Sequence, residues 1–310
     1  MQHIYPDYYH KFKCIADRCL HNCCIGWEID IDSTTANFYK SLKGDLGKRL
    51  QENVNFDAQQ PYFILKENER CPFLDSNNLC DIITNLGEER LCTICSEHPR
   101  FHNELPRRVE SGLGMCCEEA ARIILSKKDT TTLIYEKEAS ADDEIIILRD
   151  KVLEILQDRS FKINQRLDKM LLLCEAFLPC LSASQWAEEF LYLERLDEKW
   201  TDALLLLKSK GDTADAKAFD IYMKNRQEEY EQLAVYFTYR HFANAPDLEE
   251  ASIRAKFTAL SLKLIHTLGA LIYSEKGEFT LEDQIELCRM YSSEIEYSDE
   301  NLYSLFDKLA

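Results

Sequence analysis

Glycine and proline are scarce in this sequence, with 9 Gly and 7 Pro among 310 residues. The few glycines form neither a G-x-G-x-x-G fingerprint after a strand nor a P-loop, and Gly112-Leu-Gly114 stands without that context. The sequence therefore predicts no nucleotide site of the Rossmann or P-loop type. The Cys-x3-Cys-x2-Cys triplet of radical S-adenosylmethionine enzymes is also absent, because Gly26 occupies the position that would complete it after Cys19 and Cys23.

Positive charge is also in short supply. The chain has 37 Lys+Arg against 55 Asp+Glu, a net charge of −18. No basic stripe is present to neutralise phosphates, so we do not expect nucleic acid as a partner. Residues 1–125 hold 14 Lys+Arg and 19 Asp+Glu, a net of −5, which leaves −13 for the rest. An acidic half of this kind either attracts a lysine-rich partner or, more commonly, keeps the protein in solution.

Long apolar runs are missing as well. No stretch approaches the ~18 consecutive apolar residues that a membrane span needs. The first seven residues show neither the basic nor the apolar region of a secretory signal. We therefore expect a cytoplasmic protein with no membrane partner. Thiols stay reduced in that compartment, which disfavours a framework of structural disulfides.

Cysteine, by contrast, is abundant and unevenly placed. Ten of the 13 cysteines lie within the first 117 residues, whereas core packing would scatter them along the chain. Clustered thiols in a reducing compartment are typical of metal ligands or redox thiols. We predict that the metal ligands come from eight of them: Cys14, Cys19, Cys23, Cys24, Cys71, Cys80, Cys92 and Cys95.

The spacings favour an iron–sulfur cluster over zinc. Zinc sites usually contain two separated Cys-x2-Cys or Cys/His knuckles, and only Cys92-x2-Cys95 has this form. The doublets Cys23-Cys24 and Cys116-Cys117 are less typical of zinc, because neighbouring side chains point apart. Iron–sulfur clusters tolerate varied spacings and are held by four cysteines. The ten thiols leave room for a second site, and zinc and disulfides remain alternatives.

The rest of the pattern predicts a mainly α fold. We expect an irregular cysteine-rich N-terminal domain with little strand over residues 1–126, a polar linker over 127–143 and an α-helical domain over 144–310. Asp32-Ser33-Thr34 offers caps for a helix reaching about Leu50, and residues 62–65 read as a short strand. Ser184 and Thr280-x-x-Asp283 are expected to cap later helices.

Several single residues are candidates for chemistry but have ordinary explanations. Trp27 is more often a buried anchor than a metal shield, and His98 is more often structural than a ligand or base. Arg100 can hold a carboxylate bidentately or pair with a neighbouring Glu. The stretch from Tyr230 to Phe242 is expected to be core. The sequence identifies no catalytic residue and no site for a methyl donor.

The cysteine-rich part resembles the flagellin lysine N-methylases, which are related to zinc- or iron-chelating cysteine-domain proteins. Three blocks carry the resemblance, over roughly the first 125 residues: Phe12-Lys13-Cys14 through Gly26-Trp27 with Asp32 and Thr34; Cys71-Pro-Phe-Leu through Pro99-Arg100; and Cys116 or Cys117 with Glu118 and Ala120. The helical half is similar only in general character. The resemblance implies methyl transfer from S-adenosylmethionine to lysines of flagellin, with the cysteines holding an iron–sulfur cluster.

Two other functions fit the residues. One is a metal-chelating module, with zinc or iron, whose helical half docks a partner without catalysis. The other is a redox protein that uses Cys92-x2-Cys95 as an exchangeable dithiol. The redox function is disfavoured because no thioredoxin-like βαβ pattern surrounds the pair.

Overall fold

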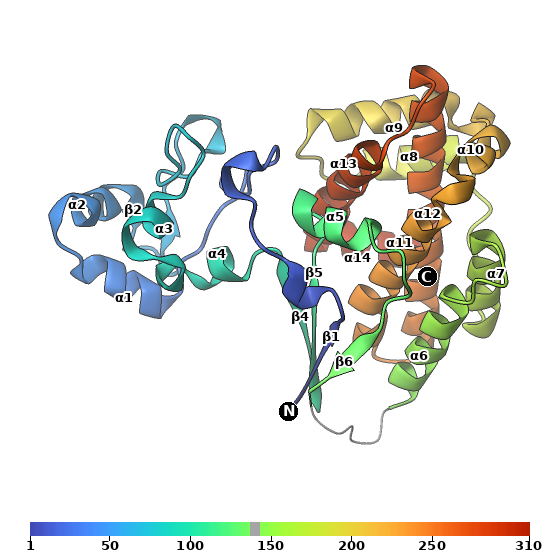
Figure 1. The fold of residues 1–310 in the computed structure, drawn as a ribbon, viewed down its shortest axis with the longest axis horizontal. Helices are drawn as coiled ribbons and strands as arrows, with labels where there is room; N and C mark the ends of the chain where they lie inside the picture. The colour runs from blue at the N-terminus through green and yellow to red at the C-terminus, as the bar shows by residue number, and fades with distance from the viewer. Residues whose placement is uncertain (137–142) are drawn as a thin grey trace. The chain divides into compact units, whose positions relative to one another are not determined.

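The computed structural model describes residues 1–136 and 143–310. These residues form two compact units, one made of residues 13–101 and the other of residues 1–12 together with 102–310 (Figure 1). The predicted boundary at residue 126 differs from this division. The first twelve residues join the larger unit because strand β1 (Gln2–Pro6) pairs with strands that come after residue 107.

The unit of residues 13–101 is built from short elements. Its Asp32 accepts a hydrogen bond from the Thr35 backbone N at 2.9 Å and so caps the first helix, as the sequence predicts. That helix ends at Ser41, and a second begins at Gly44, so the single helix expected to reach Leu50 is divided. The elements are helices α1 (Ser33–Ser41), α2 (Gly44–Asn53), α3 (Asp81–Leu86) and α4 (Thr93–Glu97), and strands β2 (Val54–Asn55) and β3 (Tyr62–Phe63).

A small aromatic core holds these elements together. The rings of Phe63 and Phe73 lie 5.2 Å apart and those of Tyr39 and Phe63 lie 6.4 Å apart, and all three side chains are buried. The Tyr39 hydroxyl donates to the Arg90 carbonyl at 2.7 Å, which ties α1 to the segment before α4. Two thiols, Cys71 and Cys92, are buried in the same core. This placement puts cysteines at the centre of the unit.

The larger unit contains a four-stranded sheet that the sequence did not predict. Its strand order is β4-β5-β1-β6, where β4 is Arg100–Leu105, β5 is Arg108–Leu113 and β6 is Leu133–Tyr135. Strand β1 runs parallel to β5 and antiparallel to β6, with Ile4 opposite Glu110 and Tyr135. Strand β6 lies in the stretch expected to be a linker. Residues 137–142 of that predicted linker lie outside the described residues.

Helices form the rest of this unit and confirm the mainly α fold (Figure 1). Thr280 and Asp283 form the predicted capping box, whereas the cap near residue 184 is Ser182, which accepts from the Gln185 backbone. The helices are α5 (Glu118–Leu125), α6 (Glu144–Leu156), α7 (Ile163–Leu173), α8 (Ala183–Leu191), α9 (Glu198–Lys210), α10 (Ala216–Tyr222), α11 (Gln227–His241), α12 (Leu248–Lys276), α13 (Leu281–Tyr291) and α14 (Asp299–Leu309).

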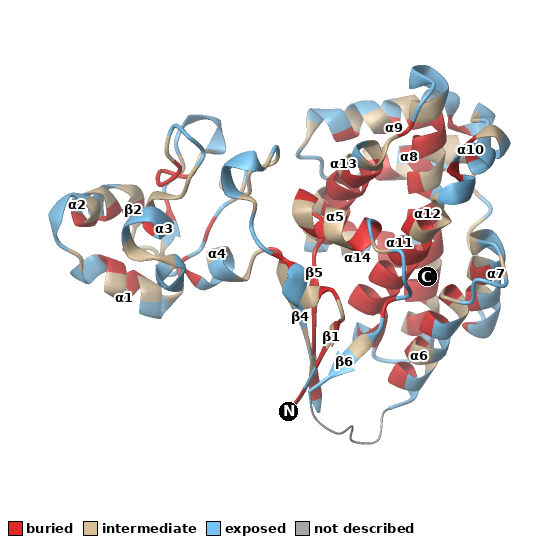
Figure 2. Ribbon diagram, in the orientation of Figure 1, coloured by how far each residue is buried: buried red, intermediate tan, exposed pale blue. Residues whose placement is uncertain are grey.

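Helix α11 is the centre of this unit. Every residue from Glu229 to His241 is buried. Figure 2 colours buried residues red, and much of the α11 ribbon has this colour. Helices α5, α6 and α12 pack against it. Helix α12 is long and apolar enough to cross a membrane by length and composition, but 72% of its most apolar window is buried inside the protein. The burial is that of a core helix.

Candidate functional site

Six of the eight predicted ligand cysteines gather in the core of the unit of residues 13–101. Cys71 and Cys92 are buried there, and Cys24, Cys80 and Cys95 pack against the same core. The thiol of Cys23 shares a hydrogen bond with that of its neighbour Cys24. The six-thiol cluster is therefore Cys23, Cys24, Cys71, Cys80, Cys92 and Cys95.

Backbone contacts bring these cysteines together from separate segments. The Cys71 backbone N donates to the Cys24 carbonyl at 2.8 Å, so the two cysteine groups of the sequence are adjacent in space. Leu74 and Cys80 form an isolated β-bridge. Cys80 occupies the N-cap position of α3, Cys92 occupies that of α4, and Cys95 lies within α4. The thiols of the six-thiol cluster therefore come from a loop, from a β-bridge and from the N-terminal ends of two helices.

The electrostatics of the six-thiol cluster reflect crowding and burial. Burial raises the pKa of Cys71 to about 11, and it also raises the pKa of Cys80. A hydrogen bond from Cys24 lowers the pKa of Cys23, and one from Cys95 lowers the pKa of Cys92. The donating thiols, Cys24 and Cys95, have raised pKa values for the same reason. Each pair therefore favours one shared proton over two thiolates.

Cys14 and Cys19 lie outside the six-thiol cluster, although the sequence prediction includes them. Cys14 is exposed and its sulfur accepts from the Ala16 backbone N at 3.4 Å. The Cys19 thiol donates to the His21 carbonyl at 3.3 Å. Cys116 and Cys117 belong to the larger unit. All 13 cysteines are free thiols in the structure.

The donor chemistry of the six-thiol cluster suits a metal. Soft thiolate ligands select zinc and iron–sulfur clusters, and thiols make up the whole set. Within the described ranges, no three His, Cys, Asp or Glu side chains are arranged as the ligands of one ion. The residues therefore fit a thiophilic metal by their type, while the ligand set stays a prediction.

The other singled-out residues of this unit have structural roles. Burial lowers the pKa of His98 to about 4, so its imidazole is neutral at pH 7. The Arg100 guanidinium donates to the Ser96 carbonyl at 3.4 Å. Asp32, besides capping α1, accepts from both the backbone N and the hydroxyl of Thr93 at 3.1 and 3.2 Å. It thereby links α1 to the helix that carries Cys95.

The larger unit contains a buried charged network that sequence reasoning missed. The Glu296 carboxylate accepts from the Tyr236 hydroxyl at 2.8 Å and lies 2.7 Å from His241 Nε2. The Arg240 guanidinium donates to the Tyr236 hydroxyl at 2.8 Å, and its Nε lies 3.4 Å from Glu296. The Tyr236 hydroxyl also accepts from the Met115 backbone N at 3.2 Å. This hydroxyl therefore connects α11, the segment after α13 and the turn that precedes Cys116.

The segment that supplies Glu296 is a π-helical turn, Ser292–Glu296, a form that is rare and frequent at functional sites. Next to it, the Tyr297 ring lies 4.6 Å from the Arg240 guanidinium carbon. A Cβ on Gly114 would lie 2.0 Å from the Tyr297 hydroxyl, so glycine is required there. The one sequence signal was the density of aromatic residues between Tyr230 and Phe242, a stretch expected to be core, and nothing indicated a partner at residue 296.

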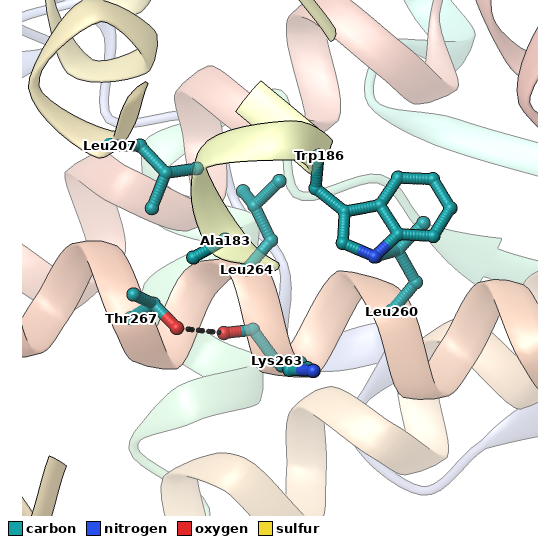
Figure 3. Close-up of a pocket in the computed structure, with 7 residues that line it drawn as sticks. All are labelled: Ala183, Trp186, Leu207, Leu260, Lys263, Leu264 and Thr267. Carbon is teal, nitrogen blue, oxygen red and sulfur yellow. Dashed lines mark hydrogen bonds between the residues drawn. The ribbon is translucent and has the colours of Figure 1, made fainter. Parts of the chain in front are cut away.

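A shallow depression lies between α8, α9 and α12 in the described part of the larger unit (Figure 3). Its lining is almost entirely carbon, and the Thr267 hydroxyl already donates to the Lys263 carbonyl at 2.8 Å. The lining residues are Ala183, Trp186, Leu207, Leu260, Lys263, Leu264 and Thr267. No cluster of polar groups converges on this depression.

Residues 181–310, which contain α11 and the π-helical turn, match the sequence model of the FliB lysine N-methylase C-terminal domain. The predicted resemblance to the flagellin lysine N-methylase family is confirmed. The matching segment, called the FliB-like domain below, lies in the helical half. The sequence showed only general similarity there. The side chains of the buried charged network, Tyr236, Arg240, His241 and Glu296, all lie within the matching segment.

Curated relatives agree with this family. The chain is 29% identical over 127 residues to the lysine-N-methylase of Salmonella typhimurium (strain LT2), a match that covers 37% of this chain and 30% of that protein. It is 29% identical over 127 residues to the flagellar biosynthetic protein FliU of Salmonella muenchen, of which 71% is covered. The match thus spans less than a third of the Salmonella typhimurium protein. No solved structure matches the chain.

Proposed function

We propose that this chain is a protein-lysine N-methyltransferase that acts on flagellin in the cytoplasm, with S-adenosylmethionine as methyl donor and a metal centre held by the six-thiol cluster. The observation that carries the proposal is the match of residues 181–310 to the FliB lysine N-methylase C-terminal domain. The names of the two Salmonella relatives, a lysine-N-methylase and a flagellar biosynthetic protein, support the same function.

The six-thiol cluster supports the metal part of the proposal. A bound iron–sulfur cluster would need four of these thiols and would supply positive charge where the thiolates repel one another. Cys24, Cys71, Cys80 and Cys92 come from four separate segments, so holding one centre would tie the unit together. The free energy of binding would then be largely folding free energy of residues 13–101. Zinc on the same thiols is the alternative.

The acidity of the larger unit supports a lysine-rich substrate. Residues 13–101 contain 10 Lys+Arg and 14 Asp+Glu, a net of −4, so −14 of the total charge of −18 lies on the larger unit. Complementary charge raises the rate of encounter and excludes wrong partners. Lysine-bearing flagellin segments would be drawn to this surface.

The chemistry places one demand on the protein. A lysine ammonium has no lone pair, so its proton must leave to a carboxylate or water before its Nζ can bond to the methyl carbon. The donor supplies an electrophilic methyl group, and the electron pair of the broken sulfur–carbon bond stays on sulfur. The protein's part is to bind the amine where desolvation or an acidic neighbour favours the neutral form.

The deciding experiment co-expresses the chain with flagellin from the same host and measures the intact mass of the flagellin. We expect increments of one methyl group on lysine peptides. The increments should disappear when Cys95 is replaced by Ser and persist when the exposed Cys180, in the other unit, is replaced by Ser. Unmodified flagellin beside a folded, metal-loaded protein would refute the enzyme and favour the second candidate, a metal-chelating binding module.

Anaerobic purification with metal analysis and an absorption spectrum tests the metal separately. We expect iron and sulfide with a brown colour. Colourless protein that contains stoichiometric zinc would show that the bound metal is zinc and not iron. Folded protein with neither metal would refute the metal centre.

A further inference from the structure

Three aromatic rings form a corner on the outer face of the sheet in the larger unit. Ile4 points inward and is fully buried, so Tyr5, the next residue of β1, faces outward. Tyr9 and His10 follow in a short 3-10 turn. The ring centroids of Tyr5 and Tyr9 lie 5.4 Å apart, and His10 lies 4.6 and 5.1 Å from them with its ring nearly perpendicular to both. We call Tyr5, Tyr9 and His10 the aromatic corner.

The aromatic corner is not part of the hydrophobic core. Tyr8, between its members in sequence, is 3% exposed, whereas Tyr5 and Tyr9 are half-buried and His10 is exposed. Single exposed aromatic side chains are ordinary, but contiguous exposed apolar surface marks a site of interaction. The rings of the corner therefore offer a surface for a partner.

A carboxylate lies beside the corner. Tyr5 pairs with Ile134 of the antiparallel strand β6, so Glu136, two residues further, lies on the same outer face. The Glu136 backbone N donates to the His3 carbonyl at 3.0 Å, and its exposed carboxylate accepts a hydrogen bond from the Tyr5 hydroxyl. Negative charge is thus held against the rings.

We infer that the aromatic corner and Glu136 bind the side-chain ammonium of a lysine in the protein substrate, as a docking site apart from the six-thiol cluster. This inference rests on the proposed function for the identity of the partner. A cation over the face of a tyrosine is attracted by the ring quadrupole, and Glu136 adds a full negative charge. An apolar side chain would make no use of Glu136, and an anion would be repelled by it.

The surrounding charges agree with a cationic ligand. Lys127, the nearby cation on the segment before β6, is already paired with Asp7 at 2.9 Å. Lys11, next to His10, is exposed and able to turn into solvent. The net charge of −14 on this unit attracts lysine at longer range.

The expected effects are modest because the site faces water. An exposed cation–π contact changes affinity by about two- to five-fold. An exposed ion pair has an effect of the same size. Replacing Tyr9 by Leu or Glu136 by Gln should therefore each weaken binding about two- to five-fold, and the double variant about ten-fold.

The test uses the full chain and a short peptide with a single lysine, titrated by saturation-transfer NMR. The comparison peptides carry trimethyl-lysine, which keeps the charge, or norleucine, which keeps the chain without the charge. We expect the lysine and trimethyl-lysine peptides to bind and the norleucine peptide to bind at least five-fold more weakly. Tyr192→Leu, a change at a tyrosine outside the aromatic corner that is 87% exposed, is the matched control and should leave binding unchanged.

Equal binding of the norleucine peptide would overturn the inference, and so would unchanged binding by the Tyr9→Leu, Glu136→Gln double variant. If Tyr9→Leu fails to fold, His10→Leu with Glu136→Gln provides the same test at exposed positions. Mass measurement of co-expressed flagellin separates the two hypotheses. Failure of the proposed function leaves flagellin unmethylated by the wild-type chain. Failure of the docking site leaves peptide binding insensitive to these variants in a chain that methylates.

Discussion

Replacing Glu296 by Gln should strongly destabilise the larger unit. The Glu296 side chain is 0% exposed and the Arg240 side chain is 9% exposed, so water cannot replace the negative charge that Arg240 loses. Breaking a buried ion pair costs about 3–5 kcal/mol. Glutamine keeps one oxygen that can accept a hydrogen bond from Tyr236 or His241. We therefore expect a loss of unfolding free energy at the lower end of this range, about 3 kcal/mol. For a unit of this size that corresponds to a fall in the thermal midpoint of about 6–12 °C.

Tryptophan fluorescence during urea unfolding measures this loss. Trp186 and Trp200 lie in the FliB-like domain and are 3% and 1% exposed, whereas Trp27 lies in the other unit. A Trp27→Phe background therefore restricts the signal to the larger unit. The unfolding midpoint then reports the free energy of that unit alone.

A surface variant provides the matched control. Glu282, whose side chain is 69% exposed, pairs with Arg122 at 3.3 Å. Exposed pairs contribute about 0–1 kcal/mol, so Glu282→Gln should leave the midpoint nearly unchanged. If Glu296→Gln costs no more than Glu282→Gln, the network does not stabilise the unit and our reasoning about buried charge is wrong.

Three further predictions concern other residues. Burial lowers the pKa of His241 below its ordinary 6.5, so the unfolded state binds a proton at a higher pH than the folded state does. The free energy of unfolding should therefore fall as the pH drops from about 7 to 5. His241→Gln should reduce this pH dependence when urea midpoints are measured across the same range. Gly114→Ala should lower the free energy of unfolding by about 1–3 kcal/mol, because the added methyl group clashes with the Tyr297 hydroxyl. In calorimetry, a Tyr297→Phe background should recover part of this loss. If the effects of the two substitutions are strictly additive, the clash is not the cause. Cys71→Ser should destabilise residues 13–101 while the far-ultraviolet helical signal persists, and thermal unfolding equal to that of Cys180→Ser would show the buried thiol to be dispensable.

The sequence predicted the elements that depend on local signals. Asp32 and Thr280 cap helices because their side chains reach backbone N–H groups within three residues, so neighbouring sequence contains the whole cause. Six of eight predicted ligand cysteines lie in one core. Their local spacing identified them as a group.

The sheet and the charged network depend on contacts between distant residues. Strand β1 was not predicted, because five residues give little period and its partner β5 comes more than 100 residues later. In the sequence, Glu296 does not differ from many other acidic residues. Only the fold shows that it lies beside Arg240, which comes 56 residues earlier in the chain. Cys14 is exposed and Cys19 is partly buried, and neither belongs to the six-thiol cluster. Composition and period carry no information about such pairings.

The nested arrangement of the units has a consequence for biosynthesis. Residues 13–101 leave the ribosome as a complete stretch before β5 exists, so this segment can collapse around its thiols while β1 still waits for a partner. The larger unit cannot close until α11 has been made, because Tyr239 donates to the carbonyls of Ile4 and Ser111. Metal insertion, if it accompanies collapse, would therefore be an early event of translation, and the FliB-like domain would assemble last onto a strand made first.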